Sequence, residues 1–217
     1  MVRKDLKEFL ETLPKDVTVV AATKYVGAPE MRTLYKYGIT NFGENRVENF
    51  LAKKDQLKAI HPTWHFIGHL QTNKVRDVVN EIDVLHSLDS VKLAQLIEEY
   101  RTVKEPMKVF IEVSINGEPQ KDGISIAELD SFIFDIRRLK KIQIVGLMGM
   151  AKKGADEHEL LKEFASLKLL RDQTEIRMQI KLPYLSMGMS DDYNQALRFG
   201  ATHIRLGRIL YTGYHKQ

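Results

Sequence analysis

The polypeptide has 217 residues, a length that suits one α/β domain of the barrel kind. Lys plus Arg number 33 and Asp plus Glu 29, and the net charge of +4 suits a small anionic ligand but is too low and too scattered for a nucleic-acid surface. Cysteine is absent, which excludes disulfides, thiolate metal sites and cysteine nucleophiles. No apolar run reaches the roughly 18 residues of a membrane span. We therefore expect a cytoplasmic protein that binds neither nucleic acid nor membrane.

The first eleven residues, Met1 to Glu11, are rich in charge and carry apolar residues at helical spacing. This pattern differs from a signal peptide and predicts an extra N-terminal helix ahead of the first strand.

Short apolar runs alternate with helical patterns along the whole sequence. Several of the runs are continuously apolar, which indicates strands buried on both faces, as in a parallel sheet. The eight predicted strands cover Val17 to Ala22, Ile39 to Phe42, Trp64 to Ile67, Val84 to Leu88, Val109 to Ile115, Ile142 to Met148, Pro183 to Leu185 and His203 to Leu206.

Between these runs, apolar residues at i, i+3, i+4 and i+7 predict amphipathic helices. Pro29 is expected to open one helix, which Gly38 closes. Asp89 is expected to cap another, Ser125 and Glu128 to form a capping box for a third, and Ser190 to begin the last. Further helices are expected around Val47–Leu51, Val75–Val79 and Leu160–Leu167.

The alternation predicts a single (β/α)8 TIM barrel over residues 1–217, with no linker or domain boundary inside it. The competing fold is an open doubly wound sheet. That fold normally carries a Gly-x-Gly-x-x-Gly turn after its first strand, and the residues from Thr23 to Gly27 do not form one.

Lys24 follows the first predicted strand, and the seven residues before it, Val17 to Thr23, are uncharged. In a TIM barrel the carboxyl ends of the strands carry the ligand chemistry. A lysine desolvated in the barrel mouth would have a lowered pKa and a free amine able to form a Schiff base. The alternative is a lysine whose charged end extends from the strand into solvent, and its position alone leaves both interpretations open.

The last two predicted strands run into turns that fit an anion. Ser190 suits a helix N-cap, and with Gly188 nearby the same backbone N–H groups would hold a phosphate. Gly207 permits a ligand to approach the backbone closely, and Arg205 should point toward the barrel mouth. The alternative for Arg205 is a surface ion pair with Asp191 or Asp192.

His65 and His69 are four residues apart, the spacing of a helical metal pair. A strand and Gly68 intervene, and no carboxylate stands at ligand spacing, so no metal site is predicted. We expect hydrogen-bonded structural histidines that line the pocket.

Six segments resemble the pyridoxal 5′-phosphate (PLP) homeostasis proteins, which are relatives of the alanine racemase N-terminal barrel. The similar segments are Ala22–Lys24, Asn41–Asn45, Trp64–Gly68 with Leu70–Gln71 and Asn73–Lys74, Gly146–Met148, Leu185–Asp192 and Arg205–Gly207. They occur in order over nearly the whole sequence, and the segment Leu185–Asp192 is the most specific.

The resemblance implies a PLP-binding barrel of the fold type III kind in which Lys24 forms a Schiff base with the cofactor. Asn45 would lie beside PLP, and Ser186, Ser190 and Gly207 would hold its phosphate. Arg205 would correspond to the arginine that faces the pyridine nitrogen in the racemases. Position 208 is usually Thr or Ser in the family and is Arg208 here, so a hydroxyl contact is lost while the backbone N–H remains.

The family is described as handling the cofactor without an established reaction, which implies a PLP carrier or buffer with no catalytic residues. An arginine at the pyridine nitrogen would weaken the cofactor as an electron sink. The sequence ends soon after the last strand, at Gln217, without the domain that supplies the second acid/base of a racemase. The alternative is an amino-acid racemase or lyase of low activity, and a third is a barrel with no ligand. The resemblance also implies a monomer that contacts PLP-dependent apoenzymes transiently.

Overall fold

The computed structural model describes residues 1–115 and 123–212. The strands are β1 (Thr18–Ala22), β2 (Asn41–Glu44), β3 (Thr63–Phe66), β4 (Val84–Leu88), β5 (Met107–Ser114), β6 (Ile124–Ser125), β7 (Ile142–Met148), β8 (Tyr184–Met189) and β9 (His203–Leu206). The α-helices are α1 (Leu6–Glu11), α2 (Ala28–Lys36), α3 (Val47–Gln56), α4 (Val75–Val78), α5 (Val91–Tyr100), α6 (Leu129–Ile136), α7 (Glu157–Met178) and α8 (Tyr193–Arg198). Short 3-10 turns are η1 (Thr72–Lys74), η2 (Ile126–Glu128) and η3 (Arg208–Leu210).

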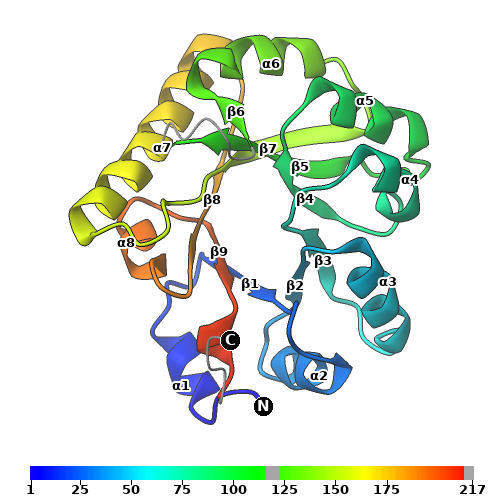
Figure 1. The fold of residues 1–217 in the computed structure, drawn as a ribbon, viewed down its shortest axis with the longest axis vertical. Coiled ribbons are helices and arrows are strands. Elements are labelled where there is room, and N and C mark those ends of the chain that lie inside the picture. The colour runs from blue at the N-terminus through cyan, green and yellow to red at the C-terminus, as the bar shows by residue number, and fades with distance from the viewer. Residues whose placement is uncertain (116–122, 213–217) are drawn as a thin grey trace.

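The strands form one closed parallel barrel. Their order is β4-β3-β2-β1-β9-β8-β7-β5, and β4 also pairs with β5, which closes the circle; the short β6 pairs in parallel with β5. Helices α2 to α8 surround the strands in chain order (Figure 1). The predicted (β/α)8 barrel is therefore confirmed, and the open doubly wound sheet is excluded.

Each predicted strand overlaps an observed one, with ends that differ by a few residues. The largest difference is at β8, which continues beyond Leu185 to Met189 and so includes Ser186 and Gly188. The prediction missed this extension because Gly188 and two serines are typical of a loop.

Three of the predicted helix starts are wrong in detail. Ser90, not Asp89, caps α5, because its hydroxyl accepts from the backbone N–H of Leu93 at 3.4 Å. Ser125 begins η2 rather than α6, and its hydroxyl bonds the Glu128 side chain. Ser190 does not start α8, which begins at Tyr193 after Asp192.

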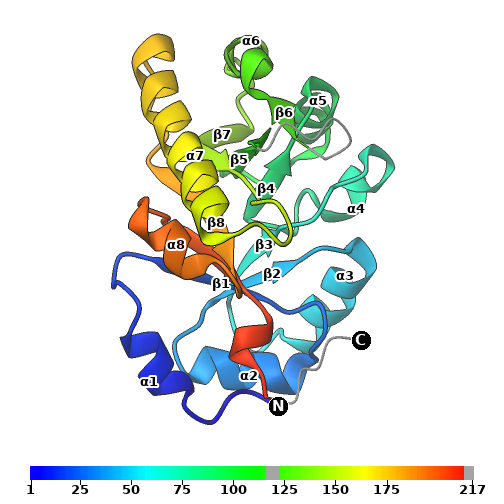
Figure 2. The same ribbon diagram turned by 60° about the vertical axis from the view of Figure 1, so that its left-hand side comes forward.

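Other helix signals agree with the structure. Helix α2 carries Pro29 in its first turn, and Gly38 follows it with a φ of +91°, a conformation that favours glycine. The predicted N-terminal helix is α1, which lies below α8 in Figure 2 and contacts it through the rings of Phe9 and Tyr193. The residues before α1 pair with the segment after β9. There, Arg3 donates its backbone N–H to the carbonyl of Leu210 at 3.0 Å.

The side chains divide into two buried layers. The large apolar core fills the space between strands and helices and includes Phe42, Phe50 and Trp64. A small separate cluster contains Val84, Phe110, Val145 and Met148. Inside the barrel, in-register neighbours such as Ser186 and His203, or Val20 and Arg205, face the same side of the sheet, and several are polar. The interior is thus filled by side chains, as in other closed eight-stranded barrels, but its composition is unusually polar.

Among the described residues, none of the helices is both long and apolar enough to cross a membrane.

Gly146 marks the closest approach between β7 and β8. A Cβ atom there would lie 1.9 Å from the backbone oxygen of Tyr184. We predict that Gly146→Ala destabilises the fold by about 3 kcal/mol or more, because rigid backbone must move. Gly27→Ala is the matched control: its Cβ would lie 3.4 Å from the Pro29 ring, and its cost should stay at about 1 kcal/mol or less, because alanine is a poorer N-cap than glycine but meets no backbone. Urea unfolding of both variants measures the difference, and equal midpoints would contradict this packing argument.

Candidate functional site

The predicted site residues converge at the carboxyl end of the barrel. Strands β1 and β9 pair in register, with Ala21 opposite Leu206. A Cβ on Gly207 would lie 3.6 Å from the Cβ of Ala22, an ordinary contact. The residues after β1 and β9 therefore meet although they are distant in sequence, and Asn45 follows the next strand, β2.

Lys24 lies two residues beyond the end of β1, as predicted, but its side chain is exposed. Its Nζ lies 4.8 Å from the centroid of the Tyr25 ring, which is itself 63% exposed. Of the two interpretations that the sequence left open, the structure therefore agrees with the lysine that extends into solvent. The strand end is open to solvent, and the Lys24 amine makes a cation–π contact with the Tyr25 ring there.

A buried ion pair fixes the backbone just before Lys24. The Glu44 carboxylate is fully buried, and its Oε1 accepts from the Thr23 hydroxyl and from Lys53 Nζ at 2.6 Å. Lys53 Nζ also donates to the backbone oxygen of Thr23 at 2.6 Å. These contacts hold the end of β1 against α3, which limits where Lys24 can be placed.

Three buried polar atoms at this end of the barrel find no hydrogen-bond partner within residues 1–115 and 123–212. They are Glu44 Oε2, Asn45 Oδ1 and the hydroxyl of Tyr211. Burial, with the charge of Glu44, raises the pKa of Tyr211 and keeps it neutral. Buried polar groups are normally satisfied, so an orphaned Asn45 Oδ1 next to the strand end is the kind of group that a bound molecule would complete.

The turns after β8 and β9 are joined by Ser190. Its Oγ accepts from the backbone N–H of Gly207 at 3.1 Å and of Ile209 at 3.4 Å. The bond that Ser190 was expected to make at the start of α8 is absent, and the Asp192 carboxylate instead accepts from the backbone N–H of Met189. A hydroxyl thus occupies backbone donors that suit an anion.

Arg208 reaches the neighbouring turn rather than the barrel interior. Its guanidinium forms an ion pair with Asp191, and both side chains are at least 37% exposed. The side chain therefore links the turns after β8 and β9 from the outside. The expected contact of the Arg208 backbone N–H with a phosphate stays a prediction.

Arg205 is buried in the barrel, 5% exposed, so the alternative of a surface ion pair is wrong. Its Nη1 donates to Ser186 Oγ at 2.6 Å and its Nη2 to the backbone oxygen of Gly149 at 3.3 Å. Burial lowers the pKa of Arg205 to about 10, while the charges of Glu112 and Asp192 raise it. The guanidinium therefore stays charged at neutral pH and acts only as a donor.

Ser186 lies below the mouth of the barrel and is fully buried. Besides accepting from Arg205, its hydroxyl lies 2.8 Å from His86 Nδ1. The predicted contact of Ser186 with a phosphate stays a prediction. The hydroxyl would have to make that contact in addition to its hydrogen bonds with Arg205 and His86.

Three other interior polar residues were not among the predicted site residues: His86, His203 and Asn41. His65 Nδ1 lies 2.8 Å from His86 Nε2, and His65 Nε2 lies 2.9 Å from Asn41 Oδ1. The predicted structural role of His65 is confirmed. The period-two spacing of His203 and Arg205 on β9 was the available signal, because alternate residues of a barrel strand face inward.

His69, four residues after His65, lies outside this interior set. Its Nδ1 is 3.0 Å from the Asp89 carboxylate on the loop after β4. Across the described parts of the chain, no group of three or more His, Asp or Glu side chains could hold a metal ion.

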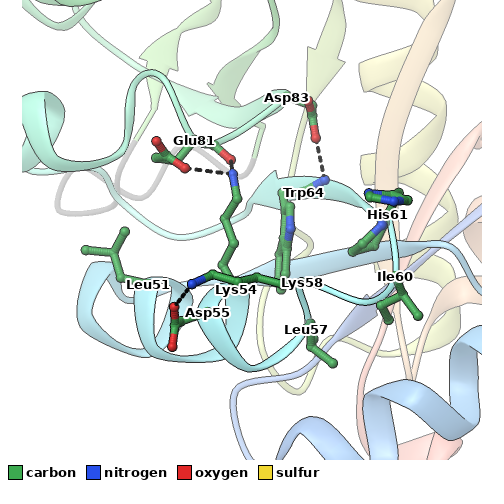
Figure 3. A pocket seen from close by; sticks show the side chains of 11 residues that line it. Leu51, Lys54, Asp55, Leu57, Lys58, Ile60, His61, Trp64, Glu81 and Asp83 are labelled. Carbon is green, nitrogen blue, oxygen red and sulfur yellow. Dashed lines mark hydrogen bonds and ion pairs between the residues drawn. The ribbon is translucent and has the colours of Figure 1, made fainter.

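Two surface hollows lie at the opposite, amino-terminal end of the barrel. One, of about 500 Å³, lies between the end of α3 and the starts of β3 and β4, where Lys54 reaches Glu81 and Asp83 holds the backbone of Trp64 (Figure 3). The other, of about 770 Å³, adjoins α1 and the start of β2. Neither contains the predicted site residues. The chemistry of the strand ends, rather than the size of a hollow, identifies the candidate site.

Removal of Lys53 should expose the cost of the buried carboxylate. Lys53→Met leaves Glu44 charged, buried and without its cation, and we predict a loss of about 3 kcal/mol in the free energy of unfolding. Lys58→Met breaks an ion pair with Asp55 whose side chains are 78% and 69% exposed, and should change stability by less than about 0.5 kcal/mol. The double variant Lys53→Met/Glu44→Gln should recover part of the loss. Chemical unfolding measures the stability of all three variants. A Lys53→Met protein as stable as Lys58→Met would contradict a stabilising role for the buried Glu44–Lys53 ion pair.

The buried histidines should make the fold sensitive to acid. Burial, aided by nearby cations, lowers the pKa of His65 to about 3 and of His203 to about 4, and lowers that of His86 well below its usual value. Below pH ~6.5 the unfolded polypeptide binds protons at these sites and the native state does not. The free energy of unfolding should therefore fall as pH drops from about 6.5 toward 4, by up to about 1.4 kcal/mol per pH unit for each histidine. Urea midpoints between pH 5 and 7.5 test this, and His65→Asn should reduce the slope by about a third. A flat profile would contradict neutral buried histidines.

The sequence matches a family model described as the alanine racemase N-terminal domain over residues 2–215. Two similar proteins are pyridoxal phosphate homeostasis proteins. That of Aquifex aeolicus is 36% identical over 195 residues, 89% of this chain and 85% of the relative. That of Synechocystis is 34% identical over 209 residues, 94% of each protein.

Solved structures agree with the sequence match. PipY of Synechococcus elongatus without PLP superimposes with a TM-score of 0.90 at 33% identity, covering 97% of this chain and all of PipY. The structure of PipY with PLP bound gives a TM-score of 0.89 at 32% identity, covering 96% and 98%. Alanine racemase of Clostridium difficile, at 15% identity and a TM-score of 0.82, shares the fold over 59% of its own length. By sequence and by fold, the chain belongs to the pyridoxal phosphate homeostasis protein family, within the group built on the alanine racemase N-terminal domain.

Proposed function

We propose that this protein binds PLP as a Schiff base on Lys24 and serves in the homeostasis of that cofactor. The observation that carries the proposal is the meeting of a primary amine, at the end of β1, with the donor-rich turn after β9. A phosphorylated aldehyde needs both groups, one for the carbonyl and one for the phosphate. The relatives named above support the same ligand.

The turns after β8 and β9 supply donors for the phosphate. The N–H groups of Gly207 and Ile209 both donate to the hydroxyl oxygen of Ser190. A phosphate dianion is a stronger acceptor than a hydroxyl, so it would take over these donors while Ser190 turns its own O–H toward the anion. The ion pair of Arg208 with Asp191 would hold the two turns together from outside.

The remaining residues fit the ring of the cofactor. The orphaned Oδ1 of Asn45 needs a donor or a bridging water, and Arg205 presents a buried guanidinium that can only donate. Against a pyridine nitrogen, such a donor favours the unprotonated ring. PLP supplies an electrophilic carbonyl and, when protonated, an electron sink; here Arg205 would keep the sink weak.

We infer from this arrangement that the protein holds and buffers the cofactor rather than catalysing a reaction with it. Lys24 would bind, Arg205 and Asn45 would orient, and the turns after β8 and β9 would retain the phosphate. We further propose that the protein is a cytoplasmic monomer, a single domain over residues 1–217, that passes PLP to apoenzymes in transient encounters. The alternative remains a racemase or lyase of low activity.

The Schiff base is directly visible. We predict that the purified protein incubated with PLP gains a visible absorbance band that borohydride removes, and that Lys24→Ala abolishes it. Lys36→Ala, at an exposed lysine on α2, should leave the band unchanged. Absorbance titration with PLP compares the band of the wild-type protein with that of each variant. A wild-type protein that gains no band with added PLP would sink the proposal.

Carrier and catalyst differ in proton exchange at an amino acid. We predict that the loaded protein in heavy water incorporates no more deuterium at the Cα of L-alanine than free PLP does, because the unprotonated ring stabilises a carbanion poorly. Exchange is followed by NMR of the alanine. Incorporation well above free PLP, lost in Lys24→Ala, would favour the enzyme.

A further inference from the structure

Five polar side chains form a continuous path through the interior of the barrel. Arg205 bonds Ser186 at 2.6 Å, Ser186 lies 2.8 Å from His86, His86 lies 2.8 Å from His65, and His65 lies 2.9 Å from Asn41. The path, called here the interior path, runs from the predicted ligand end of β9 to the start of β2. Ser186, His65 and His86 are at most 1% exposed, so water does not compete for their bonds.

The two ends of the interior path set its direction. Arg205 cannot accept a hydrogen bond, so Ser186 Oγ accepts from it. At the other end, the oxygen of the Asn41 amide faces His65 and can only accept. His65 therefore carries its proton on Nε2, its Nδ1 accepts from Nε2–H of His86, and His86 Nδ1 accepts the hydroxyl proton of Ser186. All five groups are satisfied by one arrangement of protons.

We propose that the interior path is a chain of hydrogen bonds with one fixed direction, and that it holds the Arg205 guanidinium in place. In this chain Ser186 is a positioning residue rather than a ligand of the phosphate. The proposal rests on the proposed function only in that Arg205 faces the cofactor. The direction of the path depends only on side chains of this protein.

The hydroxyl proton of Ser186 decides between its two roles. A phosphate dianion offers only acceptors, so a serine must donate to hold it. In the arrangement above, the single Ser186 proton already points to His86. The reverse direction would free this proton for a phosphate, but it would place the protons of His65 and His86 on Nδ1 and require the Asn41 amide to turn its nitrogen toward His65.

Neighbouring groups hold the path in place. Phe110 stacks on His86 with ring centroids 4.5 Å apart and an interplanar angle of 30°. The carbonyl of Gly149 accepts from Nη2 of Arg205. Because Nη1 and Nη2 are both hydrogen-bonded, the guanidinium loses little conformational freedom when a ligand binds, which is the benefit of preorganisation.

The tautomers test the direction without any ligand. In long-range 1H–15N spectra of the ligand-free protein with labelled histidine, we expect His65 and His86 both to show a protonated Nε2 and an unprotonated Nδ1 at neutral pH. Ser186→Ala should change the 15N shift of His86 Nδ1, which loses its donor. Ser87→Ala removes another buried hydroxyl, which donates to the carbonyl of Gly68 at 2.6 Å outside the path, and should leave that shift in place. A proton on Nδ1 of either histidine would overturn the proposal.

A ligand pair tests the role of Ser186 in binding. Pyridoxal has the ring and aldehyde of PLP but no phosphate. If Ser186 acts through Arg205, Ser186→Ala should weaken PLP and pyridoxal by a similar factor, about tenfold, in absorbance titrations. Ser190→Ala should weaken PLP by a similar factor and leave pyridoxal nearly unchanged, because its contact is to the phosphate.

The outcomes separate this proposal from the proposed function. A Ser186→Ala loss confined to PLP would make Ser186 a phosphate ligand and overturn the inference. If the wild-type protein bound neither compound, the proposed function would fail while the tautomers still reported on the path. Thermal melting of each variant identifies any that do not fold, and the wild-type spectra alone decide the direction in that case.

Discussion

The pairing of β1 with β9 is the constraint on which the site depends. It joins the first strand of the barrel to the last, and its register places Ala21 opposite Leu206. Without that closure, Lys24 and the turn at Gly207 would lie at separate edges of a sheet. Because parallel strands share one carboxyl end, the same closure gathers the residues after β2 and β8 there as well. The ligand site is thus a consequence of topology before it is one of side chains.

The closed barrel also creates a cost that the interior must offset. A buried guanidinium is expensive unless its donors are satisfied. The structure meets this cost with Ser186 and the carbonyl of Gly149, and Ser186 in turn needs His86. The outer layer around Phe42, Phe50 and Trp64 supplies the hydrophobic stability. The two buried layers therefore have different tasks, stability outside the strands and placement of charge within them.

Local pattern was enough to predict the eight strands, the position of Lys24 and the turn at Gly207, because each depends on a few consecutive residues. Long-range partners were not predictable in this way. Ser186 and His86 are 100 positions apart, and the Glu44–Lys53 pair joins a strand to a helix at no regular spacing. Ser190 resembles an N-cap in sequence, yet its hydroxyl serves the turn after β9, since only the closed fold brings that turn near. The sequence left the exposure of Lys24 open because strand position does not fix a flexible side chain.

The central claim is that one lysine, placed by closure of the barrel, holds the cofactor. The most direct test is peptide mapping by mass spectrometry after the PLP-loaded protein is reduced with borohydride. The account predicts a single modified residue, Lys24, at one cofactor per protein. Modification spread over exposed lysines such as Lys36 and Lys58, with Lys24 not enriched, would contradict it.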